Sequence, residues 1–158
     1  MGVNVPFFRR DRRHALVLWV RTMNSDIDLN KTENWRSPDP GQTVVLVVED
    51  EVVVRNLARM VLELEGYFVL TADNGEKALD ICRRYPSIIH AAVSGVNLPE
   101  MDGRELRQRI LTERPGIKVL LTWEHTVTPV ENAPFLQKPF GPTALKGRIK
   151  QLLASASA

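Results

Sequence analysis

The chain has 158 residues, of which 44% are hydrophobic and 25% are charged, the balance of a soluble globular protein. This length predicts one domain with a core of modest size and an appendage. A formal net charge of +2, with no net charge over residues 43–158, argues against a strong attraction to nucleic acid or membranes.

Residues 1–42 are predicted to form an N-terminal extension and linker. The apolar run Ala15–Val20 follows four arginines, but Arg21 interrupts it after six residues. A signal sequence needs an apolar segment of roughly 7–15 residues and a membrane helix about 20. Asn24–Gln42 is polar and rich in turn residues. We expect the extension to be mobile; the alternative is a short amphipathic docking segment that uses Trp19 and Trp35.

From residue 43 onward, apolar runs typical of buried strands alternate with helical patterns. Strands are expected over 43–48, 67–72, 88–94, 117–122 and 134–137, and helices before Gly66 and over 74–85, 104–114 and 141–155. In the first helix an apolar face is expected from Leu57, Met60, Val61 and Leu64. In the last helix it is expected from Leu145, Ile149, Leu152 and Leu153. Residues 155–158 are expected to form a tail.

Cys82 is the only cysteine, so no intrachain disulfide is possible. It lies in the second expected helix, where we interpret it as a small helix-face residue and not as a reactive thiol. This cysteine usage is consistent with a cytoplasmic protein.

Repeated strand–helix units predict a parallel sheet covered by helices on both faces. Ligand sites in such sheets lie at the carboxyl ends of the strands. This rule nominates the following residues: Glu49, Asp50, Glu51, Ser94, Gly95, Thr122, Trp123 and Lys138.

The residue types at these strand ends allow two kinds of chemistry. The acids Glu49, Asp50 and Glu51 are ligands for a hard cation such as Mg²⁺, or else ordinary solvated acids at a helix start. Lys138, which precedes Pro139, can present a fixed positive charge to an anion.

Four motifs follow one another in the chain: VLVVEDE, NG..AL, NLP.MDGREL and FLQKPF. Together they resemble the receiver domain of bacterial response regulators over about residues 43–153. The resemblance implies a flavodoxin-like (βα)5 fold, a doubly wound parallel α/β sheet with strand order 2-1-3-4-5. It also implies a receiver-like domain over 43–154.

In that family an aspartate at the end of strand three accepts a phosphoryl group from a kinase histidine. Strand-one acids hold Mg²⁺, and a hydroxyl residue and a lysine bind the phosphoryl oxygens. By resemblance, Glu49 and Asp50 match the acid pair, Lys138 matches the lysine, and Phe135 stands at the position of the switch aromatic.

Two positions depart from the family pattern. Gly95 stands where the phosphoacceptor aspartate is expected, and Trp123 stands where the hydroxyl residue is expected. Side chains alternate along a strand, so neither Ser94 nor Thr122 is expected to substitute for them. The indole of Trp123 is hypothesised to fill the space above Gly95.

A third departure lies between the last two strands. The segment from Trp123 to Ala133 contains Pro129 and β-branched residues that disfavour a helix. We expect the helix of this crossover, the family's fourth helix, to be shortened or missing.

These features favour a stand-alone pseudo-receiver in two-component signalling, a non-enzymatic module that contacts a histidine kinase or another signalling protein. Mg²⁺ binding at Glu49 and Asp50 is expected to be weak, and no nucleic-acid or membrane partner is expected. Two alternatives remain open: a working receiver that uses a displaced acid such as Asp50 or Asp102, and a degenerate fragment without selected activity.

Overall fold

The computed structural model describes residues 37–124 and 133–155. Contacts divide the chain into residues 1–36 and 37–158, and the described residues all belong to the second unit. The expectations for Trp19 and Trp35 fall outside the described residues. Within the described part, the Gln42 side chain donates a hydrogen bond of 2.9 Å to the carbonyl of Gly66.

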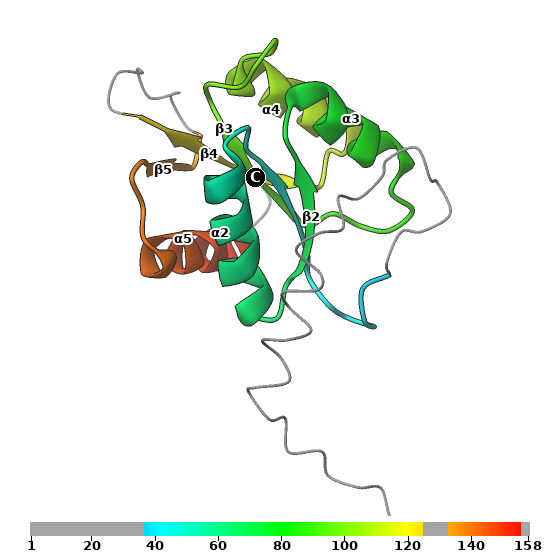
Figure 1. Ribbon diagram of the computed structural model, residues 1–158. Coiled ribbons are helices and arrows are strands. Elements are labelled where there is room, and N and C mark those ends of the chain that lie inside the picture. Colours follow the sequence, from blue (N-terminus) through cyan, green and yellow to red (C-terminus); the bar gives the residue numbers. More distant parts are fainter. Residues whose placement is uncertain (1–36, 125–132, 156–158) are drawn as a thin grey trace, which may run out of the picture. The chain divides into compact units, whose positions relative to one another are not determined.

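Five strands and four helices alternate through the described residues (Figure 1). In chain order they are β1 (Val44–Val48), α2 (Val52–Leu64), β2 (Phe68–Ala72), α3 (Gly75–Arg84), β3 (Ala91–Gly95), α4 (Gly103–Glu113), β4 (Lys118–Trp123), β5 (Phe135–Gln137) and α5 (Pro142–Ala154). All strand pairs are parallel, and the strand order is β2-β1-β3-β4-β5. The predicted doubly wound sheet is therefore confirmed.

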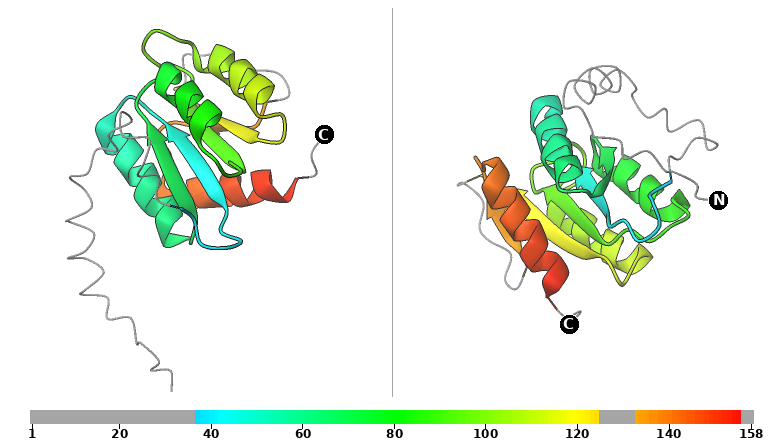
Figure 2. Two further views of the ribbon diagram at one scale, coloured as in Figure 1. Left: turned by 90° about the vertical axis from the view of Figure 1, so that its right-hand side faces the viewer. Right: turned by 90° about the horizontal axis from the view of Figure 1, so that it is seen from below.

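The helices cover the two faces of the sheet in pairs. Helices α2 and α5 lie on one face and α3 and α4 on the other (Figures 1 and 2). Burial of β-branched and aliphatic side chains between these layers supplies the main favourable term for folding. No helix among the described residues has the length and apolar character that a membrane crossing requires.

The helix labelled α4 is present and connects β3 to β4. The crossover for which we predicted a shortened or missing helix is a different segment, between β4 and β5. Residues 125–132 of that crossover lie outside the described residues. That prediction therefore stays untested.

The buried face of α2 differs from the one predicted from its apolar spacing. Ala58, Val61 and Leu62 are buried, whereas Leu64 is 80% exposed. Apolar residues in this helix fit two neighbouring phases of the helical repeat, and packing on the sheet selects the phase that buries Ala58 and Leu62 with Val61. The prediction for α5 is confirmed, because Leu145, Ile149 and Leu152 are buried and Leu153 packs against the core.

Local signals explain where the helices begin and end. Asn74 caps α3, since its side chain accepts a hydrogen bond of 2.9 Å from the backbone N–H of Lys77. Gly66 follows α2 with a φ of 91°, a left-handed conformation that glycine adopts without strain. Cys82 is buried in α3, and burial raises the pKa of its thiol to about 11, as expected for an inert helix-face residue.

The loop between β3 and α4 packs tightly against the strand that precedes it. A Cβ on Gly103 would lie only 2.0 Å from the carbonyl oxygen of Gly95. A Cβ on Gly75 would lie 2.8 Å from the sulfur of Met101. The glycines of the NG and MDG motifs therefore bring α3, α4 and the end of β3 together at the carboxyl edge of the sheet.

Candidate functional site

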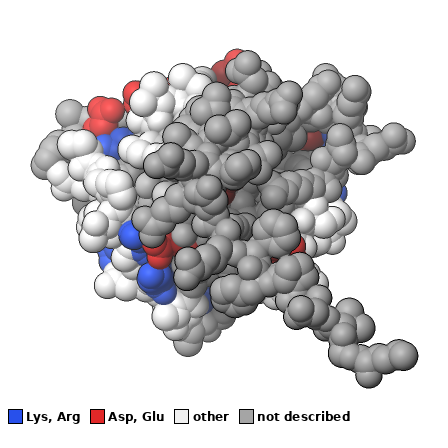
Figure 3. Space-filling view, turned by 60° about the horizontal axis from the view of Figure 1, so that its bottom comes forward, with Lys and Arg blue, Asp and Glu red and all other residues white. Residues whose placement is uncertain are grey.

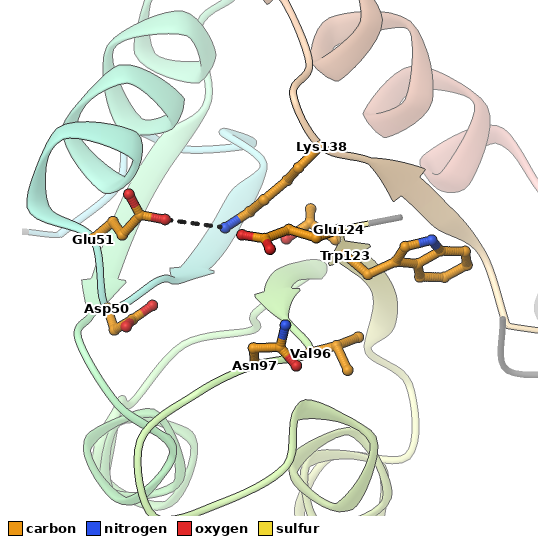
Figure 4. A pocket seen from close by; sticks show the side chains of 8 residues that line it. Asp50, Glu51, Val96, Asn97, Trp123, Glu124 and Lys138 are labelled. Carbon is orange, nitrogen blue, oxygen red and sulfur yellow. Dashed lines mark ion pairs between the residues drawn. The ribbon is translucent and has the colours of Figure 1, made fainter. Parts of the chain in front are cut away.

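The carboxyl ends of the strands form a small pocket at one edge of the sheet, with a volume of about 140 Å³ (Figure 4). Its lining residues are Asp50, Glu51, Val96, Asn97, Thr122, Trp123, Glu124 and Lys138. The strand-end rule had nominated Asp50, Glu51, Thr122, Trp123 and Lys138. Sequence reasoning missed Val96, Asn97 and Glu124. Val96 and Asn97 are the first two residues after β3, and Glu124 is the first residue after β4.

A buried ion pair connects the carboxyl end of β1 with the carboxyl end of β5. The Nζ atom of Lys138 lies 2.8 Å from Oε2 of Glu49, and the Glu49 residue is only 4% exposed. A second carboxylate oxygen, Oε1 of Glu51, lies 3.9 Å from the same Nζ atom (Figure 4). Lys138 thus directs its charge at protein carboxylates.

The environment of Glu49 shifts its protonation equilibrium. Burial raises the pKa of its carboxyl, while the hydrogen bond and charge of Lys138 lower it by less. A hydrogen bond with Asp50 raises the pKa further, and one from the Glu51 backbone lowers it. The net result is a Glu49 pKa above its ordinary value.

Arg55 of α2 stabilises the backbone that carries these acids. One of its Nη atoms donates hydrogen bonds to the carbonyl oxygens of Glu49 and Asp50, at 2.6 and 3.0 Å. The start of α2 has no side-chain cap. Arg55 therefore supplies hydrogen bonds that position the loop after β1.

Gly95 ends β3 beside the ion pair. A Cβ placed on it would lie 3.4 Å from Cδ2 of Leu98 and 3.6 Å from Oε2 of Glu49. These are ordinary van der Waals distances, so the Cα–H of Gly95 that a side chain would replace faces the Glu49 carboxylate. Leu98 is the nearest side chain to this position.

The hydroxyls of Ser94 and Thr122, at the ends of β3 and β4, are both buried. Ser94 is fully buried, and its Oγ donates to the carbonyl oxygen of Gly95 at 3.1 Å. Thr122 pairs with Gly95 across the sheet, and its buried Oγ1 has no hydrogen-bond partner among the described residues.

The indole of Trp123 does not occupy the space above Gly95, so that hypothesis is wrong. Figure 4 shows the ring directed away from Lys138 and Asp50. It stacks instead on Phe135, with ring centroids 4.2 Å apart and an interplanar angle of 19°. The attraction between two apolar rings on neighbouring strands accounts for this orientation.

Asp102, one of the proposed displaced acceptors, is engaged elsewhere. Its carboxylate caps α4 by accepting from the backbone N–H of Arg104 at 2.7 Å, and it forms an ion pair with the Arg104 guanidinium at 2.8 Å. These contacts hold the pKa of Asp102 below its ordinary value. Asp102 does not line the pocket, whereas Asp50 does.

The residues of this edge fit a tightly held divalent cation poorly. Among the described residues, no group of three or more His, Cys, Asp or Glu side chains is arranged to hold a metal ion. Glu49 is directed at Lys138, and Gly95 offers no side-chain ligand. Asp50, Glu51 and Glu124 remain as the acids that line the pocket.

Charges on the described surface are mixed. Figure 3 shows basic and acidic side chains as small neighbouring groups on the face that it views. Between the end of α2 and α5, Lys146 and Lys150 lie 2.8 and 2.9 Å from the carboxylate of Glu65.

The family model described as "Response regulator receiver domain" matches residues 45–150. "Probable transcriptional regulator ycf27" of Porphyra purpurea is 34% identical over 119 residues, which cover 71% of this chain and 48% of that protein. "Sensor kinase CckA" of Brucella abortus is 33% identical over 120 residues, 72% of this chain and 13% of that protein. The chain thus spans about half the length of the ycf27 relative and a small part of the CckA relative.

Solved structures give the same result. The receiver domain of the hybrid histidine kinase CckA matches with a TM-score of 0.62 at 34% identity, covering 70% of this chain and 98% of that one. A CheY-like receiver domain protein from Methanospirillum hungatei JF-1 matches with a TM-score of 0.63 at 26% identity, covering 71% and 94%.

Proposed function

The chain belongs to the response regulator receiver domain family, and we propose that it is a pseudo-receiver that signals by protein–protein contact without accepting a phosphoryl group. Receiver domains are generally non-enzymatic modules of two-component signalling, and we propose no catalytic activity for this one. The observation that carries the proposal is the environment of Gly95, which ends β3 beside the Glu49–Lys138 ion pair.

Covalent phosphoryl transfer to a protein needs a nucleophile at the reacting position. Gly95 has no side chain, and the neighbouring Ser94 hydroxyl is buried and donates to a backbone carbonyl. Lys138 is ion-paired with Glu49 at 2.8 Å. The positive charge that would bind an incoming phosphoryl group is therefore offset by a carboxylate of the same chain.

We further propose that Mg²⁺ binds weakly at this edge. Mg²⁺ takes six oxygen ligands in octahedral geometry, usually one or two carboxylates together with waters and phosphate oxygens. Here Asp50, Glu51 and Glu124 line the pocket, but the Glu49 carboxylate is ion-paired with Lys138 and Gly95 supplies no carboxylate at the end of β3. No step of the proposed function requires the ion.

A second candidate function is a working receiver with a displaced acceptor. Asp50 lines the pocket, and this placement favours it over Asp102, which caps α4. An acyl phosphate on Asp50 would have to form next to Glu49 and Glu51, whose negative charges repel a phosphoryl donor. We therefore rank this candidate below the pseudo-receiver.

The proposed partner is a histidine kinase or another protein of a two-component pathway, in the cytoplasm. The match to the receiver part of a sensor kinase supports a partner of this class. Binding of such a partner should not depend on phosphoryl donors.

Intact-mass spectrometry after incubation with acetyl phosphate and Mg²⁺ tests the proposal. The wild-type protein should show no phosphoryl adduct, whereas an active receiver treated in parallel should show one. An adduct on the wild type would overturn the pseudo-receiver. Its loss in Asp50→Asn but not in Asp102→Asn would then establish the displaced acceptor.

A further inference from the structure

Trp123 and Phe135 are diagonal neighbours on β4 and β5. Trp123 pairs with Gln137, and Phe135 pairs with Leu121, so the two aromatic residues project from the same face of the sheet two positions apart. Their rings stack at a centroid distance of 4.2 Å. Trp123 is 5% exposed, whereas Phe135 is 38% exposed and forms part of the outer surface.

Arg148 of α5 holds the same phenylalanine from a second element. Its guanidinium carbon lies 5.6 Å from the Phe135 ring centroid, within the range of a cation–π contact. Its Nε donates to the Phe135 carbonyl oxygen at 3.0 Å, and an Nη atom donates to Oε1 of Gln151 at 3.1 Å. We call Trp123, Phe135 and Arg148 the aromatic clasp.

We propose that the aromatic clasp holds the surface formed by β5 and α5 in one conformation, whatever occupies the strand-end pocket. This inference rests on the proposed pseudo-receiver function and specifies its regulation, because a partner would meet the same surface at all times. A phenylalanine that is over a third exposed on a three-residue edge strand would otherwise exchange between χ1 rotamers.

The clasp should also prevent a change of charge in the strand-end pocket from altering the conformation of the surface formed by β5 and α5. Trp123 lines the pocket, and its carbonyl oxygen accepts from the backbone N–H of Lys138 at 2.7 Å. Any movement of the Phe135 ring would break its stack on the buried indole of Trp123. The Glu49 carboxylate lies 2.8 Å from the Lys138 ammonium and therefore offsets a change in charge beside this lysine.

Side-chain NMR of the full chain tests the clasp directly. Three-bond couplings to the Cβ protons and Cγ of Phe135 should report one χ1 rotamer in the wild type. In Trp123→Thr and in Arg148→Met the couplings should become averaged, with the rotamer ratio falling by up to about tenfold, the size expected for losing such contacts. Lys150→Met removes another α5 cation, one that pairs with Glu65, and should leave the couplings unchanged.

Averaged couplings in the wild type would overturn the proposal, as would a single rotamer in both clasp variants. If Trp123→Thr does not fold, as judged by amide dispersion, Arg148→Met alone decides. A single rotamer in that variant would then count against the clasp.

A second arm tests the uncoupling of pocket and surface. Glu49→Gln alters the pocket charge, and the amide shifts of 135–137 and 142–154 should stay unchanged by it in the wild-type background. The same change made in Trp123→Thr should shift these amides. Equal shifts in both backgrounds would contradict the inference. Failure of the pseudo-receiver function would be visible separately, as a phosphoryl adduct on the wild type.

Discussion

Glu49 and Lys138, 89 positions apart in the numbering of the chain, form a buried ion pair of 2.8 Å across the carboxyl edge of the sheet. Oε2 of the same glutamate lies 3.6 Å from where a Cβ of Gly95 would stand. The carboxylate of Glu49, directly after β1, thus neutralises Lys138 beside Gly95, a position that carries no acid of its own.

Replacing Lys138 by methionine should destabilise the protein at neutral pH. The substitution would leave the Glu49 carboxylate buried without its cation. Because the Lys138 side chain is 17% exposed, we expect the free energy of unfolding to fall by about 2–3 kcal/mol, less than for a fully buried pair. Urea titrations give the free energy of unfolding. The cost should shrink in acid, where Glu49 becomes protonated and no longer needs a cation.

Lys77→Met is the matched control. Lys77 also forms a close ion pair, 2.6 Å from Asp73, but the two side chains are 46% and 39% exposed. Its loss should change stability by less than about 0.5 kcal/mol, as is usual for solvated pairs. Equal costs for the two lysines would show that the Glu49–Lys138 pair is not specially buried in solution.

The pH dependence of stability should reveal the raised pKa of Glu49. A carboxyl whose folded pKa is raised contributes stability below its ordinary value of 4.5, and this is lost as pH rises through the folded value. Unfolding free energies of Glu49→Gln and the wild type should therefore diverge in favour of the variant as the pH rises above 4.5 through the raised folded pKa of Glu49.

Glu65 provides the control of opposite sign. Hydrogen bonds from Lys146 and Lys150 lower the pKa of its carboxyl, so its contribution is present above 4.5 and is lost as pH falls through the folded value. Glu65→Gln should therefore lose its stability difference from the wild type in acid. If both variants followed the same trend with pH, the assigned environments of the two carboxyls would be incorrect.

Gly95→Asp combined with Trp123→Thr should raise the affinity for Mg²⁺. An aspartate Cβ fits at 3.4 Å from Leu98 and 3.6 Å from Glu49 Oε2, so its carboxylate would join Asp50 at the pocket edge. An added carboxylate ligand and a hydroxyl at the end of β4 supply groups that cation and phosphoryl binding use. Calorimetric titration with Mg²⁺ measures the change.

The single variants separate the two contributions in this repair. Gly95→Asp alone should account for most of the gain in Mg²⁺ affinity, because only the aspartate supplies a carboxylate. Trp123→Thr alone should leave the affinity near that of the wild type. An unchanged affinity in the double variant would mean that residue 95 does not face the strand-one acids.

Gly103→Ala should destabilise the fold. The added methyl would meet the Gly95 carbonyl at 2.0 Å and Val96 Cα at 2.8 Å, both backbone atoms, and relieving such overlap typically costs about 1–3 kcal/mol. Gly147→Ala in α5 is the control, because nothing lies within 4 Å of its added Cβ. It should stabilise by about 0.5–1 kcal/mol, since alanine favours a helix over glycine. Thermal unfolding compares the two variants.

The arrangement of strands and helices was largely predictable from sequence. Continuous apolar runs identified the strands, and residues such as Asn74 and Gly66 marked helix ends through local geometry. The exposure of Leu64 was not predictable, because apolar residues in α2 outnumber those that the sheet can cover. Only the packing of the helix selects between two adjacent phases.

The candidate site was predicted as a set of positions but not as a set of contacts. The strand-end rule nominated Glu49, Gly95 and Lys138, yet the ion pair depends on how far a glutamate side chain reaches across the sheet. The stack of Trp123 on Phe135 depends on the register of β4 against β5. The sequence of the connecting segment does not predict this register. Side-chain direction at strand ends was therefore the weakest part of the sequence reasoning.

Phosphotransfer from an autophosphorylated histidine kinase tests the central claim most directly. The purified chain would be mixed with a radiolabelled kinase and Mg²⁺ beside an active receiver, and the label would be followed by electrophoresis. We predict that the label passes to the active receiver and never to this chain, because Gly95 offers no carboxylate. Stable label on the wild-type chain would contradict the pseudo-receiver.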